Sequence, residues 1–145
     1  MAVRRIFIWV VLLLVLVGSA CRKNQQVLSA GGIITFSTDT LKFDTVFTAA
    51  GSFTTGIMIF NPQNDAVVLS SVQMENGTAS FFHLNVDGFQ GNVATNIKIA
   101  AHDSIYVFAT VKIDPTDTLT PFLITDRLVA TMNGNVFSIP FTAYG

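Results

Sequence analysis

Cysteine is almost absent from the chain, because Cys21 is the single one among 145 residues. One thiol cannot form an intramolecular disulfide, and it cannot supply the several thiolates of a structural zinc site. A chain of this length can nevertheless bury enough apolar surface to fold without cross-links. We therefore expect one domain that is stabilised by packing and hydrogen bonds.

Basic charge is also scarce. Residues 1–20 contain Arg4 and Arg5, and the remaining chain keeps six basic and nine acidic residues, a net charge of −3. Nucleic acids and anionic lipid headgroups are bound through basic patches. We therefore expect neither of them as a partner.

Catalytic motifs are missing as well. His83 and His102 lie outside any HExxH-type segment, and there is no GxSxG, Gly-rich phosphate loop or paired-carboxylate motif. Oxygen-rich turns at 61–65 and 114–117 could hold calcium, although such turns more often form for backbone reasons. We expect no enzymatic activity, no cofactor and no metal, and a hydrolase with an unrecognised site is the remaining enzymatic alternative.

The N-terminus carries a targeting pattern. Arg4 and Arg5 precede an apolar run over residues 6–17 and three small residues at 18–20. With Cys21 next, this pattern resembles the lipobox of bacterial lipoproteins, in which the cysteine is acylated before the chain is cleaved at its amino side. We expect a helical lipoprotein signal peptide over residues 1–20 and a lipid such as palmitate on Cys21. A retained membrane helix is one alternative to the signal peptide, but the apolar run is shorter than the roughly 20 residues that span a bilayer. The alternative to lipidation is that Cys21 is an incidental thiol at the end of a signal peptide.

The segment after Cys21 is polar. Residues 21–32 end in Ser-Ala-Gly-Gly, which predicts a flexible tether between the lipid and the domain at 33–145. Because one acyl chain binds only weakly, stable anchoring needs more than one on Cys21.

Strand-like runs fill the remaining chain. The clearest is Ser104–Ile113, where apolar residues alternate with a period of two, and Asn133-Gly134 is a strong hairpin signal. No window has sustained helical spacing. We expect an all-β fold, an immunoglobulin-like antiparallel sandwich of seven to nine strands. The expected strands are 33–37, 41–47, 53–60, 66–74, 81–86, 96–99, 104–113, 123–132 and 136–144.

Several segments resemble the N-terminal domain of a family of Bacteroidetes lipoproteins: residues 34–47, Phe60-Asn61-Pro62, residues 82–88, residues 103–108 and Ala143-Tyr144-Gly145. Such domains are similar to the immunoglobulin-like modules of the abnormal-spindle and Hydin type. The resemblance implies a module without catalytic residues. In longer relatives a repetitive β-rich region follows, so it also implies either a short relative or a truncated N-terminal module.

Bacteria of this group O-glycosylate exported proteins at Asp, then Ser or Thr, then an apolar residue. Four triplets fit this pattern, and the candidate sites are Thr40, Thr45, Ser104 and Thr118. The alternative is structural, because an aspartate side chain caps the turn before a strand and threonine suits the strand.

The favoured function is a non-catalytic, lipid-anchored protein of the cell envelope, with the outer membrane as the expected site and scaffolding, adhesion or protein interaction as its role. Its partner would be another envelope protein. Surface-exported lipoproteins of this group tend to carry acidic residues directly after the lipidated cysteine, and residues 22–26 contain none. The sequence therefore does not decide whether the domain faces the periplasm or the outside of the cell.

The alternative function is a glycan-binding module of a polysaccharide-uptake system. Aromatic sugar-binding surfaces usually consist of Trp and Tyr side chains. Here Trp9 lies in the predicted signal peptide, and the rest of the chain keeps only Tyr106 and Tyr144. The phenylalanines are expected in the core.

Overall fold

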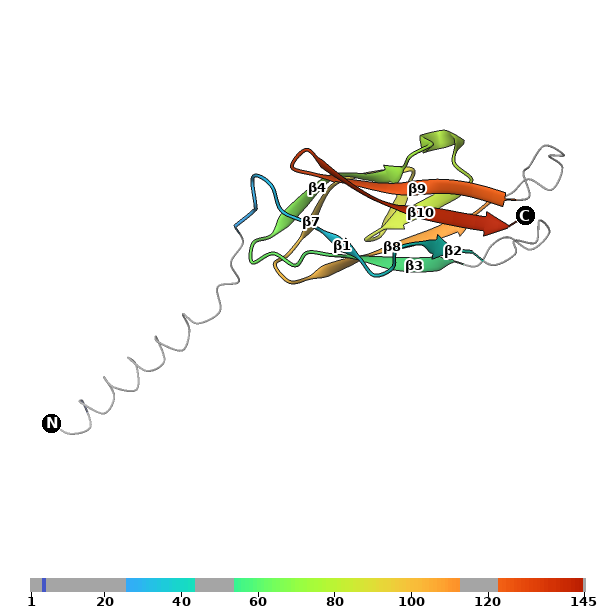
Figure 1. Cartoon of the computed structure of the whole chain (residues 1–145). Coiled ribbons are helices and arrows are strands. Elements are labelled where there is room, and N and C mark those ends of the chain that lie inside the picture. Colours follow the sequence, from blue (N-terminus) through green and yellow to red (C-terminus); the bar gives the residue numbers. More distant parts are fainter. Residues whose placement is uncertain (1–3, 5–25, 44–53, 113–122, 145) are drawn as a thin grey trace.

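The computed structural model describes Arg4 and residues 26–43, 54–112 and 123–144 (Figure 1). The predicted signal peptide apart from Arg4, the lipidation site Cys21 and the candidate glycosylation sites Thr45 and Thr118 lie outside the described residues. No helix within the described ranges is long and apolar enough to cross a membrane.

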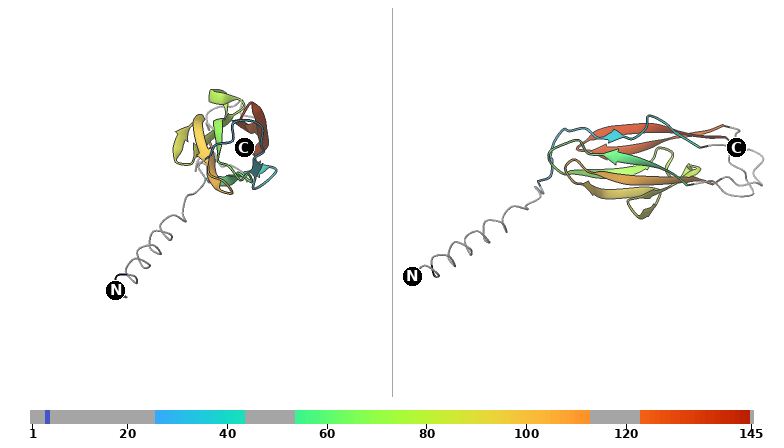
Figure 2. Two further views of the ribbon diagram at one scale, coloured as in Figure 1. Left: turned by 90° about the vertical axis from the view of Figure 1, so that its left-hand side faces the viewer. Right: turned by 90° about the horizontal axis from the view of Figure 1, so that it is seen from below.

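The described chain forms ten strands in two five-stranded sheets, which Figure 2 shows end-on and from below. The first sheet has the order β1-β3-β8-β5-β6, and the second has the order β2-β10-β9-β4-β7. A 3₁₀ turn, η1, covers Gly77–Ala79. The strands are β1 Thr35–Phe36, β2 Leu41–Lys42, β3 Thr55–Phe60, β4 Val67–Met74, β5 Phe82–Val86, β6 Phe89–Gly91, β7 Val93–Ile99, β8 Ser104–Val111, β9 Leu123–Met132 and β10 Asn135–Tyr144.

This strand order is that of an immunoglobulin-like sandwich. The row β1-β3-β8-β5 follows the order of strands A, B, E and D, and β10-β9-β4 follows that of G, F and C. The predicted fold class is therefore confirmed. Two details differ: the described ranges hold ten strands instead of seven to nine, and β2 pairs with β10 in parallel, where only antiparallel pairs were expected.

The additional strand, β6, forms a short hairpin with β5. Asp87 and Gly88 adopt positive φ angles of 49° and 88°, which a tight two-residue hairpin turn requires. All three residues of β6 are exposed, so the segment has no apolar alternation that would predict a strand. The next strand, β7, begins at Val93, three residues before the predicted start at Asn96.

The strand with the strongest predicted alternation is confirmed as β8. Its residues Ile105 and Val107 are buried, whereas Tyr106 is 53% exposed and Phe108 is 43% exposed. The predicted hairpin is also confirmed, because a turn at Asn133-Gly134 joins β9 to β10 over ten register pairs.

The core lies between the two sheets, and three phenylalanine rings occupy one end of it. The ring of Phe82, on β5, lies 5.4 Å from that of Phe43 and 5.5 Å from that of Phe141, on β10. Phe82 and Phe141 are fully buried. These aromatic contacts join the first sheet to the second.

The second half of the predicted tether lies against the domain. The amide of Leu28 donates to the carbonyl of Ala66 at 2.8 Å, and the side chain of Asn133 donates to the carbonyls of Leu28 and Gly31 at 3.1 Å. Leu28 also packs against the core. Within the described residues, contacts with the domain are present from Gln26 onward, and the polar composition of this segment did not indicate them.

Candidate functional site

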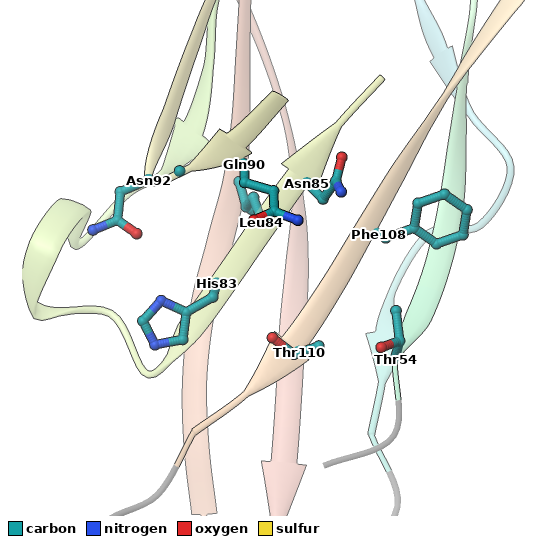
Figure 3. A pocket seen from close by; sticks show the side chains of 9 residues that line it. Thr54, His83, Leu84, Asn85, Gln90, Asn92, Phe108 and Thr110 are labelled. Atoms are coloured by element: carbon teal, nitrogen blue, oxygen red, sulfur yellow. The ribbon is translucent and has the colours of Figure 1, made fainter. Parts of the chain in front are cut away.

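The outer face of the first sheet contains a groove of about 670 Å³. Its side chains come from β5, β6 and β8 and from the residues that flank β6 and precede β3. Figure 3 shows His83 and Asn92 on one side of the groove and Phe108 and Thr54 on the other. We call it the β5–β8 groove; its lining residues are Thr54, His83, Leu84, Asn85, Gln90, Gly91, Asn92, Phe108 and Thr110.

Strand register positions these side chains. Phe108 on β8 pairs with Gly56 on β3 and with Asn85 on β5, and Asn85 pairs with Gln90 on β6. One row of outward-facing residues therefore crosses four strands. Alternation along each strand places these side chains on one face of the sheet. Strand pairing then brings together residues that lie far apart in the sequence.

Phe108 presents an aromatic ring to solvent. It stacks on Tyr106, with ring centroids 5.7 Å apart and an interplanar angle of 7°. A Cβ atom at Gly56 would lie only 3.0 Å from the Phe108 ring, so the ring fits because residue 56 is glycine. Tyr106 and Gly56 thus hold a flat apolar surface at one wall of the groove.

The remaining lining side chains are mostly polar and uncharged. Asn85 Oδ1 accepts a hydrogen bond from the amide of Gly88 at 3.0 Å, which leaves its NH₂ group for other contacts. Within the described part of the chain, the side chains of His83, Gln90 and Asn92 make no hydrogen bond with protein groups. Leu84, which is 4% exposed and belongs to the core between the sheets, borders the groove where β5 crosses it.

This set of side chains offers binding chemistry. Amides, hydroxyls and an imidazole can donate and accept hydrogen bonds, and the ring of Phe108 supplies apolar contact. No carboxylate and no thiol is among the groove's lining residues, and His83 makes no hydrogen bond with Thr110, its neighbour across the strand pair. Among the described residues, no group of three or more His, Cys, Asp and Glu side chains could hold a metal ion.

The second histidine has a structural role. His102 adopts a positive φ of 55°, and its Nε2 lies 2.8 Å from Asn64 Oδ1. This contact joins the turn before β8 to the turn after β3. The two histidines therefore differ, because His83 lines the groove and His102 is engaged with a neighbouring turn.

In the oxygen-rich turn at 61–65, after β3, the side chain of Asn61 makes hydrogen bonds with backbone groups. Asn61 is 1% exposed, and its Nδ2 donates to the carbonyls of Asp65 (2.9 Å), Ile99 (3.3 Å) and Ala100 (2.8 Å). Its Oδ1 accepts the amide of Gln63 at 3.0 Å. This side chain closes its own turn and ties β3, in the first sheet, to the end of β7, in the second.

A second, smaller hollow lies beside Asp126 on β9. Asp126 is 7% exposed, and its Oδ1 accepts from the amides of Arg127 at 2.7 Å and Asn76 at 3.3 Å. Its Oδ2 is buried and has no hydrogen-bond partner in the described chain. The hollow measures about 170 Å³, below the roughly 300 Å³ at which ligand pockets usually begin.

Two of the four candidate glycosylation sites are described, and neither lines the groove. Thr40 is half-buried directly before β2. Ser104 is half-buried at the start of β8, where Asp103 Oδ1 accepts its amide at 2.8 Å. This contact is the capping that the structural alternative expects, and glycosylation at both sites stays a prediction.

The groove was not predicted from the sequence. The phenylalanines were assigned to the core, although the alternation in β8 places Phe108 on the same face as Tyr106. No role in a site was predicted for His83, and no strand was predicted at Gln90. Asp87-Gly88 was the signal that could have found Gln90, because this dipeptide commonly turns one strand back along another.

No family model and no curated protein matches the chain. Among solved structures, a protein of unknown function from Porphyromonas gingivalis W83 is similar at 16% identity and a TM-score of 0.61, over 87% of this chain and 50% of that one. The chain thus spans about half the length of that protein. More distant are the Salmonella enterica SafA pilin in complex with the SafB chaperone (10% identity, TM-score 0.49, 82% and 57% covered) and a family 123 glycoside hydrolase from Clostridium perfringens (9%, 0.49, 73% and 23%). The likeness to the Porphyromonas gingivalis protein supports the sandwich fold, and none of the three indicates an activity for this chain.

Proposed function

We propose that this chain is a non-catalytic interaction domain of the cell envelope, anchored by lipid on Cys21, that binds its partner in the β5–β8 groove. The observation that carries the proposal is the groove itself. It exposes a fixed aromatic ring beside polar side chains that make no hydrogen bond within the described chain. Such a surface suits a ligand, because an aromatic body and convergent polar groups give a binding site its affinity and its orientation.

The position of the chain ends suits an anchored domain. The described segment that begins at residue 26 (blue) and the end of β10 (red) lie at opposite ends of the elongated sandwich (Figure 1). A lipid on Cys21 would hold the end near Gln26 at the membrane surface. The groove, on the flank of the sandwich, would then stay open to partners in the envelope.

Lipid attachment has a direct test. Cells that express the full chain are grown with a palmitate analogue, and the chain is expected to carry the label on Cys21. Replacing this residue, Cys21→Ala, should abolish the label completely, because no other cysteine is present. The Arg22→Ala variant is the control and should keep it. Label that persists in Cys21→Ala, or a mature unacylated N-terminus, would contradict the anchor.

Partner binding at the groove is tested by crosslinking in growing cells. A diazirine amino acid in place of Gln90 is expected to capture an envelope component, because Gln90 lies in the groove. The same group in place of Val136, which is 66% exposed on β10 of the other sheet, should capture several-fold less. Equal yields at the two positions would show that the groove is not the binding surface.

A further inference from the structure

We infer that the β5–β8 groove binds a neutral saccharide. This inference rests on the proposed function and names the ligand class of the same site. Three properties of the groove carry it: the aromatic ring of Phe108, the uncharged polar lining, and a central strand, β5, whose backbone is paired on both sides.

The aromatic wall matches the shape of a sugar ring. One face of a pyranose presents mainly C–H groups, which pack against a flat aromatic ring. Phe108 offers such a ring at 43% exposure, and its stacking on Tyr106 and its close fit over Gly56 restrict its orientation. A ring held in one orientation loses little conformational entropy when a ligand binds.

The polar lining matches hydroxyl groups. A saccharide hydroxyl both donates and accepts hydrogen bonds, and a side-chain amide does the same through its two ends. Gln90 and Asn92 offer complete amides, Asn85 offers its NH₂ group, and His83 and Thr110 lie in the same hollow. No Lys, Arg, Asp or Glu is among the lining residues, so a sulfate, phosphate or uronic acid would find no counter-charge there.

The central strand of the groove is closed to a peptide that would extend the sheet, although β6, which also lines the groove, is the edge strand. A peptide that extends a sheet needs unpaired backbone groups. The backbone of β5 is paired with β6 on one side and β8 on the other, so the strand at the centre of the groove offers none. The groove volume of about 670 Å³ also lies within the range of roughly 300–1,000 Å³ that is typical of small-ligand sites.

The test is equilibrium binding of the chain from residue 22 onward to immobilised neutral oligosaccharides of glucose, galactose, mannose and N-acetylglucosamine. All the contacts described above lie between Gln26 and Tyr144, so this chain keeps them. It is made in a host that does not O-glycosylate it. At least one of these glycans should bind, and salt should change the affinity little, because no charged contact is involved.

The variants separate the aromatic contact from folding. Phe108→Leu should weaken binding about tenfold, because it removes the flat ring from the wall of the site, whereas Phe108→Tyr should keep the affinity. Phe89→Leu is the matched control, because Phe89 is 63% exposed on β6, is absent from the groove lining and alternates with Gln90. The Phe89→Leu variant should bind the saccharide with unchanged affinity.

Three outcomes would overturn the inference: no binding to any of these glycans, binding only to sulfated or uronic-acid glycans, or equal losses with Phe108→Leu and Phe89→Leu. Failure here is distinguishable from failure of the proposed function. If no glycan binds but the crosslinker at Gln90 still captures an envelope protein more strongly than the one at Val136, the interaction function stands and the saccharide assignment is wrong.

Discussion

Replacing Phe82 by alanine is expected to lower the free energy of unfolding by about 4 kcal/mol. The side chain is fully buried, and its ring lies within 5.5 Å of the rings of Phe43 and Phe141. Truncation would remove the aromatic contacts that join the two sheets and would leave a cavity. A close-packed core refills such a cavity only in part.

Urea unfolding of the chain from residue 22 onward measures this loss. Phe89→Ala is the control, because Phe89 is 63% exposed and its truncation should cost less than about 1 kcal/mol. If Phe82→Ala does not fold, Phe82→Leu keeps most of the apolar volume and should lose about half as much. Equal midpoints for the Phe82→Ala and Phe89→Ala variants would show that these rings do not hold the sheets together.

Replacing Asn61 by alanine is expected to lower the free energy of unfolding by about 3 kcal/mol. Asn61 is 1% exposed, and its amide makes four hydrogen bonds with backbone groups. Alanine would leave the carbonyls of Ile99 and Ala100 without this donor. Because a buried polar group that loses its partner keeps its full desolvation cost, the loss should exceed that of a surface hydrogen bond.

Thermal unfolding offers a convenient measurement, and Asn64→Ala is the matched control. Asn64 lies in the same turn, and its side chain makes an exposed contact with His102. Asn61→Ala should lower Tm by roughly 10 °C, whereas Asn64→Ala should lower it by no more than a few degrees. Asn61→Asp should be no better than alanine, because it removes the donor. A Tm for Asn61→Ala within a few degrees of the unmodified chain would contradict the role of this amide.

Much of the fold was predictable because its longer strands alternate regularly. In β8 every second side chain from Ile105 to Val111 is buried, and the pair β9–β10 turns at Asn133-Gly134. These patterns are local, so composition and spacing reveal them. The parallel pairing of β2 with β10 is not local, since the register joins Leu41 to Phe141 across about a hundred residues.

The groove was harder to predict because it depends on how strands pair. Phe108, Asn85 and Gln90 become neighbours only through the registers of β8, β5 and β6. A phenylalanine in an alternating strand fits either a core or a surface position, and composition favours the core. In the structure Phe108 is 43% exposed, so it lies on the surface.

The most direct test of the account is an NMR titration of the chain from residue 22 with neutral oligosaccharides, read through the backbone amides. If saccharide binds in the groove, the largest shifts will fall on Asn85, Gln90 and Phe108 and their neighbours on β5, β6 and β8, while the amide signals of β9 and β10 will not shift. Absence of shifts at saturating saccharide, or the largest shifts on β9 and β10, would contradict the claim that the β5–β8 groove is a saccharide-binding site.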